Sequence, residues 1–199
     1  EDCEQLCKWH DEISQAVVTY IGCGGVGSTS SITMAGLGVK EIRLVDFDVI
    51  EKSNLNRQLF FTLEDVGKAK VDVLRTRIQE RFPHVKVTTH KENCVDLKNL
   101  AKVLERSDVT LVTADDPISI IHQTIDFCNQ NSIKMVSTGY MVDKLKVSYF
   151  PGYESNPDFI WSRGPNFIAP SYGPSNVELA GVASSVLTLA LLDQIPEES

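Results

Sequence analysis

A glycine-rich turn between two β-rich runs constrains the fold of this chain more than any other feature. The first run, Ala16–Ile21, is apolar and β-branched, and it stops at the turn GCGGVGS, residues 22–28. Small, helix-compatible residues continue to Gly36, and Glu41–Val45 is again strand-like. The order strand, tight turn, helix, strand is typical of the beginning of a parallel α/β sheet.

The rest of the chain alternates in the same way. Residues 68–82 place apolar side chains at spacings of three and four among charges, which predicts an amphipathic helix that ends before Pro83. Further helices are expected at 96–105 and 118–131, and strands at 85–89, 109–113, 135–137 and 145–150. Parallel strands need crossover connections, so the predicted fold class is α/β, a doubly wound, mostly parallel, Rossmann-like sheet.

The length of 199 residues predicts a single domain over 1–199. Residues 1–15 are expected to be an N-terminal helix or a truncated lead-in. Five prolines and three glycines without a clear period predict an irregular, substrate-side segment at 151–174. A closing apolar helix is expected at 175–194.

Composition excludes several classes of protein. The formal charge of -8, from 19 basic and 27 acidic residues, argues against a nucleic-acid partner. The longest apolar stretches fall short of the roughly 20 residues that a membrane span requires, so no membrane partner is expected. Five scattered cysteines without a CxxC pair favour a reducing compartment, and we expect a cytoplasmic protein.

The turn and the acid that follows it predict a nucleotide site. Backbone amides at a helix N-terminus bind phosphate, and glycine lets the phosphate approach closely. Asp46 ends the second run, 19 residues beyond Gly27, where a carboxylate can accept hydrogen bonds from ribose hydroxyls. The alternative is a set of glycines that only pack a turn.

Cations downstream of Asp46 distinguish an ATP site from a dinucleotide site. The segments SNLNRQ at 53–58 and GKAK at 67–70 supply Arg57 and Lys70. Hydride transfer has no use for them, whereas a guanidinium and an ammonium neutralise charge on a triphosphate and on departing pyrophosphate. Either residue alone would be interpreted as an ordinary surface cation.

Asp115 follows the predicted strand 109–113, at the end where doubly wound sheets bind their ligands. Carboxylates beside substrate phosphates commonly hold Mg²⁺, so Asp115 is the candidate magnesium ligand. The alternative is that Asp115 or Asp116 caps the next helix, and this role suits Asp116 better.

The ordered set GCGGVGS, LVDFD, SNLNRQ, VGKAK and TADDP resembles the ThiF/MoeB superfamily of adenylating enzymes, relatives of the ubiquitin-activating enzymes, over about residues 17–192. The resemblance implies that the turn glycines line the ATP phosphates: Gly22, Gly24, Gly25 and Gly27. It implies that Asp46 binds the ribose, that Asp115 holds Mg²⁺, and that four side chains contact the phosphates: Asn54, Arg57, Gln58 and Lys70. Catalytic roles then fall to Arg57, Lys70 and Asp115.

Two segments, VTADDP at 112–117 and STGY at 137–140, are similar to the peptide-modifying branch that includes MccB and PaaA. That branch acts on ribosomally made peptides in antibiotic biosynthesis. The family commonly carries two CxxC pairs for zinc in its C-terminal half, but no cysteine follows Cys128, so zinc is not supported by this chain. The same absence disfavours a downstream catalytic thiol.

The resemblance thus implies an ATP- and Mg²⁺-dependent adenylyltransferase, typically a homodimer, that activates a carboxylate of an acidic peptide or protein for capture by an internal nucleophile. Two alternatives remain open: an adenylyltransferase for a sulfur-carrier protein of the thiamine or molybdopterin type, and a non-catalytic dimerisation subunit of the same fold.

Overall fold

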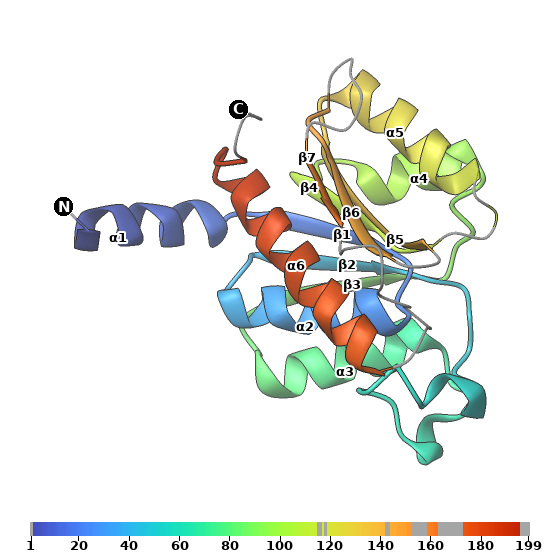
Figure 1. The fold of residues 1–199 in the computed structure, drawn as a ribbon. Coiled ribbons are helices and arrows are strands. Elements are labelled where there is room, and N and C mark those ends of the chain that lie inside the picture. Colours follow the sequence, from blue (N-terminus) through green and yellow to red (C-terminus); the bar gives the residue numbers. More distant parts are fainter. Residues whose placement is uncertain are drawn as a thin grey trace.

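A computed structural model describes residues 2–114, 117, 119–141, 144–152, 159–162 and 173–195. These residues form one sheet with helices on both faces (Figure 1). In chain order the elements are α1 Asp2–Ile13, β1 Val17–Ile21, α2 Gly25–Leu37, β2 Glu41–Val45, the 3-10 turns η1 Lys52–Asn54 and η2 Leu63–Asp65, α3 Lys70–Arg81, β3 Lys86–His90, α4 Leu97–Leu104, β4 Val109–Val112, α5 Ser119–Asn131, β5 Lys134–Met141, β6 Lys144–Phe150, β7 Phe159–Ser162 and α6 Gly173–Leu191.

The strand order is β3-β2-β1-β4-β5-β6-β7. The first five strands are parallel, and β6 and β7 add to the β5 edge as antiparallel strands. The predicted doubly wound, mostly parallel sheet is therefore confirmed. The chain runs outward from β1 to β3 and then returns to β4, so the strand order reverses between β1 and β4, where such sheets bind ligands.

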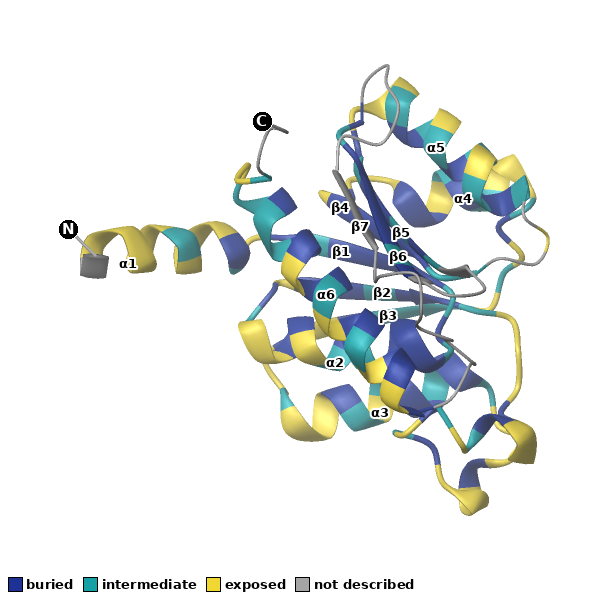
Figure 2. Cartoon of the chain, viewed as in Figure 1, coloured by how far each residue is buried: buried dark blue, intermediate teal, exposed yellow. Residues whose placement is uncertain are grey.

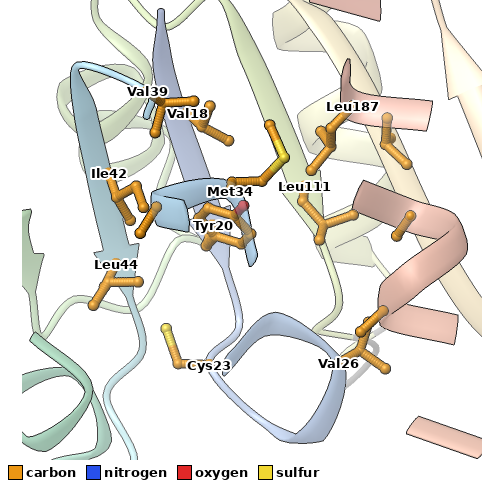
Figure 3. Packing of buried hydrophobic residues seen from close by; sticks show 14 of the residues in the cluster. Val18, Tyr20, Cys23, Val26, Met34, Val39, Ile42, Leu44, Leu111 and Leu187 are labelled. Atoms are coloured by element: carbon orange, nitrogen blue, oxygen red, sulfur yellow. The ribbon is translucent and has the colours of Figure 1, made fainter. Parts of the chain in front are cut away.

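Alternate side chains of the central strands belong to two separate cores. Tyr20 and Leu44 pack with α2, α3 and α6, whereas Ile21 and Val45 pack with α4 and α5. Figure 3 shows Tyr20, Leu44 and Met34 of α2 among the side chains of the first core. The buried strands lie between exposed helix faces in Figure 2, as expected for a parallel sheet that is covered on both sides.

Helices α2 and α6 pack closely because their contact is built from small residues. Ser184 of α6 donates a hydrogen bond to Ser30 of α2 across 2.9 Å, and both side chains are buried. Ala180 and Ala183 belong to the same core. This contact brings the N-terminal turn of α6 against the glycine-rich turn and so supplies one wall of the site.

One part of the segment predicted to be irregular forms a strand. Residues 159–162, with the sequence FIWS, make β7 and pair with β6, so the prediction is wrong for these four residues. Aromatic and β-branched residues favour strands, and the β6 edge supplies a partner that local sequence does not reveal. Helix α6 begins at Gly173, two residues before the expected closing helix.

Helix α1 occupies the region predicted as an N-terminal helix or a lead-in, and it projects away from the sheet (Figure 1). Most of its side chains are exposed, and Ile13 at its end is buried in the core (Figure 2). Within the part of the chain that the structure covers, no helix combines the length and apolar character needed to span a bilayer.

Candidate nucleotide-binding site

The glycine-rich turn packs directly against the end of β4. Gly22 has a φ of +100°, and a Cβ at this position would lie 2.6 Å from Thr113 Oγ1 and 2.8 Å from the amide nitrogen of Ala114. Thr113 Oγ1 donates a hydrogen bond to the Gly22 carbonyl across 3.0 Å. Both the backbone conformation and the space therefore require glycine.

Two further glycines permit close approach of neighbouring elements. A Cβ on Gly25 would lie 2.2 Å from Asn176 Oδ1 of α6, and a Cβ on Gly27 would lie 2.0 Å from the carbonyl oxygen of Gly22. Gly27 does not line the cavity, so its observed role is to let α2 start directly behind the turn. Contact of Gly27 with phosphate stays a prediction.

Asp46 lies at the carboxyl end of β2 and faces the turn. Its two carboxylate oxygens accept hydrogen bonds from the amides of Cys23, at 2.8 Å, and Asp48, at 2.9 Å. Each oxygen has a second lone pair, which leaves the carboxylate able to accept a ribose hydroxyl. Cys23 is fully buried, and burial together with the Asp46 charge raises the pKa of its thiol, so Cys23 stays protonated beside this acid.

The two predicted cations come from the connection between β2 and α3. Lys70 is the first residue of α3, its side chain is only 7% exposed, and its Nζ forms an ion pair with Asp48 at 2.7 Å. Arg57 donates from Nη1 to the Ser53 carbonyl at 3.1 Å and to Asn56 Oδ1 at 2.9 Å. These contacts hold both cations at the cavity wall, because Arg57, Lys70 and Asp48 all line it.

The two predicted amide side chains differ in position. Gln58 lines the cavity and is buried, and its Oε1 has no hydrogen-bond partner within the described residues. Asn54 lies outside the cavity lining, and its Oδ1 accepts from the Glu51 amide at 3.0 Å in a capping box around η1. Asn54 therefore orders the turn that precedes Arg57, while its contact with phosphate stays a prediction.

The cavity has a volume of about 380 Å³ at the carboxyl ends of β1 and β4. It brings together seven of the predicted binding residues: Gly22, Gly24, Gly25, Asp46, Arg57, Gln58 and Lys70. Backbone amides, cations and a carboxylate acceptor thus meet around one space, which is the polar inventory that a nucleoside triphosphate requires.

Several lining residues are not among the predicted binding residues. The loop after β3 contributes residues 92–95, β5 contributes Thr138 and Gly139, and α6 contributes Asn176. Cys94 in that loop is nearly buried, and burial raises the pKa of its thiol to about 12, followed by a smaller effect of Glu92. A thiol with this pKa is not a nucleophile near neutral pH.

The predicted magnesium ligand, Asp115, lies outside the described residues, as does its neighbour Asp116. Among the residues that are described, no group of three or more His, Cys, Asp and Glu side chains is placed to hold a metal ion. Magnesium at Asp115 therefore stays a prediction.

A buried carboxylate anchors the connection that carries Arg57 and Lys70. Asp65 accepts hydrogen bonds from the Thr62 amide and hydroxyl at 3.0 and 2.9 Å, from Lys68 Nζ at 3.1 Å and from Arg77 of α3 at 3.1 Å. Burial alone would raise the pKa of Asp65, but these donors and cations lower it to about 2. Asp65 thereby ties the loop to the helix that begins with Lys70.

Replacement of Asp65 by alanine is expected to lower the free energy of unfolding by about 1–3 kcal/mol, because the hydrogen bonds that Thr62, Lys68 and Arg77 donate to this buried carboxylate are lost. The folded-state pKa is depressed, so the contribution is fully present above about pH 4 and is lost as the pH falls towards 2. Urea unfolding of both proteins between pH 7 and pH 3 measures this difference. A stability difference that does not shrink below pH 4 would contradict the assignment.

The ThiF family model matches residues 8–165 of this chain. Among curated proteins, the chain is 36% identical over 117 residues to "Adenylyltransferase and sulfurtransferase MOCS3" of Culex quinquefasciatus, which covers 59% of this chain and 26% of that protein. It is 31% identical over 126 residues to the tRNA threonylcarbamoyladenosine dehydratase of Escherichia coli, which covers 63% of this chain and 47% of that protein.

Solved structures share the whole fold. E. coli MccB crystallised with ATP superposes with a TM-score of 0.79 at 25% identity, over 95% of this chain and 59% of MccB. PaaA superposes with a TM-score of 0.81 over 99% of this chain and 62% of PaaA, and its 21% identity supports the fold alone. The chain spans about a quarter to about half of the two curated relatives. It belongs to the ThiF family.

Proposed function

We propose that this chain binds ATP and adenylates a carboxylate of a peptide or protein. The observation that carries the proposal is the convergence of Arg57 and Lys70 with the glycine-rich turn on one cavity at the point of strand reversal. Similarity to MccB, which crystallised with ATP, supports the choice of nucleotide. A nicotinamide dinucleotide carries only an internal diphosphate, so it offers the two cations neither a γ-phosphate nor a departing pyrophosphate to stabilise.

The cavity residues have different roles in the proposed reaction. The substrate carboxylate attacks the α-phosphorus, a P–O bond forms, and the bond to the β-phosphate oxygen breaks with release of pyrophosphate. Negative charge accumulates on the departing group, and Arg57 and Lys70 stabilise it electrostatically. Asp46 orients the nucleotide through its ribose, while Asp48 holds Lys70 in place before the phosphates arrive.

We assign Asp115 as the residue that would hold Mg²⁺. The ion would offset charge on the phosphates when bound, as it does in other nucleotide-dependent transfers. Support comes from the position of Asp115 two residues after Thr113, which lines the cavity at the end of β4.

We propose a ribosomally made acidic peptide as substrate, with an internal nucleophile of that peptide displacing AMP, in antibiotic biosynthesis. The similarity to MccB supports this choice, and MccB was also solved with its peptide MccA. Thiol capture is disfavoured at the buried cysteines, since burial raises the pKa of Cys94 and of Cys128 to about 12. An attack from within the bound peptide needs only proximity.

The sulfur-carrier alternative has support of its own, since MOCS3 is named as an adenylyltransferase and sulfurtransferase. Under that alternative the adenylation chemistry at Arg57 and Lys70 is the same, and only the partner protein differs. A non-catalytic subunit is less well supported, because such a chain would be free to lose Arg57, Lys70 and Asp115, and all three are present.

We also propose that the chain acts as a homodimer in the cytoplasm. Large apolar side chains on the connection that carries the cations are exposed, with Leu59 at 54%, Leu63 at 67% and Val66 at 43%, and burial of such side chains favours association. Four cysteines are free thiols, in keeping with a reducing compartment: Cys7, Cys23, Cys94 and Cys128.

Mg²⁺-dependent exchange of labelled pyrophosphate into ATP tests the proposed chemistry, with acidic precursor peptides and a carrier protein ending in Gly-Gly offered in parallel. Arg57→Ala is expected to lower the exchange rate by about 10²–10³, the range found when one donor to a developing anion is removed. Arg81→Ala, at the exposed end of α3, is the control and should leave the rate unchanged. Full activity of the folded Arg57 variant would contradict its role.

A further inference from the structure

A second groove, separate from the nucleotide cavity, runs along the outer edge of β3. Its volume is about 600 Å³, and its walls come from β2, β3, α3 and the end of α4. Glu92 lines the nucleotide cavity and Lys102 lines the groove, and these two residues form an ion pair between the two spaces. The proposed adenylation makes no use of this groove.

The backbone of β3 presents hydrogen-bonding groups on the side away from β2, where the described sheet has no further strand. The Lys86 amide donates to the Lys40 carbonyl at 3.1 Å, and the His90 carbonyl accepts from the Asp46 amide at 3.1 Å, so these residues turn their backbone groups toward β2. Backbone groups of a parallel strand alternate in direction, so those of Val87 and Thr89 point outward. Both residues line the groove, and β3 is an edge strand of the described sheet.

The charge of the groove is opposite to that of the chain. Six charged side chains line it, four basic and two acidic: Arg43, Arg75, Lys102, Arg106, Glu41 and Glu105. Their net charge is +2, whereas the whole chain carries -8. Charge of this sign, concentrated in one concave region of an acidic protein, attracts an anionic partner.

Two of these cations are available to such a partner. The side chain of Arg75 is 43% exposed and that of Arg106 is 89% exposed, and their ion pairs with Asp72 and Glu105 are long, at 3.9 and 4.0 Å. Arg43 is different, because its side chain is only 15% exposed and its guanidinium already bonds Glu41 at 3.0 Å. Arg43 therefore shapes the groove floor, and Arg75 and Arg106 carry the charge at its rim.

We propose that this edge binds an extended acidic peptide segment as an added strand of the sheet. The outward amides and carbonyls of Val87 and Thr89 would pair with the peptide backbone, and peptide carboxylates would bind Arg75 and Arg106. A free phosphate or a nucleic acid uses only the positive charge, whereas a peptide strand uses the alternating donors and acceptors as well. The site is independent of the proposed adenylation, because it lies beyond the Glu92–Lys102 pair.

Fluorescence anisotropy with a short labelled peptide of alternating valine and glutamate tests the proposal on the whole chain, without ATP. Arg75→Glu and Arg106→Glu are each expected to weaken binding by about threefold to tenfold, as exposed charge pairs do when one sign is reversed. Lys8→Glu on α1 makes the same change of charge far from the groove and should have no effect. Thermal unfolding confirms that each variant is folded.

Thr89→Pro separates strand addition from simple charge attraction. Proline removes one outward amide and leaves the ladder between β2 and β3 intact, so binding should fall by about tenfold or more if a strand is added. Binding that survives Thr89→Pro, equal binding of a valine-lysine peptide, or stronger binding of a single-stranded oligonucleotide would each overturn the proposal. Peptide binding is measured without ATP, so a failure of the proposed adenylation in the pyrophosphate-exchange assay would not change the interpretation of peptide binding.

Discussion

Replacement of Lys70 by alanine is expected to weaken ATP binding by about 10–100-fold, the equivalent of one lost charge-assisted hydrogen bond. The Lys70 side chain is 7% exposed and lines the cavity, and among the described residues its only ionic partner is Asp48. Asp48 is 51% exposed, so its carboxylate stays hydrated when the ammonium is removed. The variant should therefore fold normally, and isothermal titration calorimetry with ATP measures the loss.

Lys68→Ala is the matched control for this prediction. Lys68 lies two residues earlier, is 58% exposed, pairs with Asp65 and does not line the cavity. Its loss should change ATP affinity by less than about twofold, because exposed ion pairs contribute little. Equal losses in both variants would show that the effect reflects general charge near the site and would refute a specific contact by Lys70.

Gly27→Ala is expected to destabilise the protein by about 3 kcal/mol, at the upper end of the range for overpacking. The new Cβ would lie 2.0 Å from the Gly22 carbonyl oxygen and 3.0 Å from its carbon, so backbone must move. The same Cβ would also lie 3.2 Å from Thr113 Oγ1, so the backbone that must move belongs to the glycine-rich turn itself. ATP affinity should therefore fall together with stability, and urea unfolding and calorimetry measure the two effects.

Gly181→Ala provides the opposite outcome with the same chemical change. Gly181 lies on the exposed face of α6, and among the described residues no atom outside the backbone of this helix lies within 4 Å of an added Cβ. Alanine stabilises an open helical position by up to about 1 kcal/mol relative to glycine, so this variant should gain stability. If Gly27→Ala also gained stability, the close packing of α2 behind the turn would be disproved.

The central part of the fold was readable from local pattern because its strands and helices are consecutive. The run before Gly22 and the run ending at Val45 became β1 and β2 with the expected bounds at their carboxyl ends. β7 was not readable, since FIWS is a short segment among prolines whose strand state depends on pairing with β6. Pairing between segments that lie far apart in the sequence leaves no periodic pattern of apolar residues within either segment.

The site residues likewise divide into those that the local sequence predicts and those that only the packing of distant elements brings to the cavity. Asp46 and Lys70 were predictable because motif spacing places them after a strand and at a helix start, and both line the cavity. Asn176 was not predictable, because α6 reaches the turn only through its packing on α2. The loop at 92–95 likewise carries no motif, and it enters the cavity because β3 ends beside β2.

Calorimetric titration of the intact chain with ATP, AMP and NAD in the presence of Mg²⁺ tests the central claim most directly. If Arg57 and Lys70 bind the outer phosphates, ATP should bind at least about tenfold more tightly than AMP, and NAD should not compete. A folded protein that binds ATP and AMP equally, or that prefers NAD, would contradict the assignment of this cavity as an ATP site.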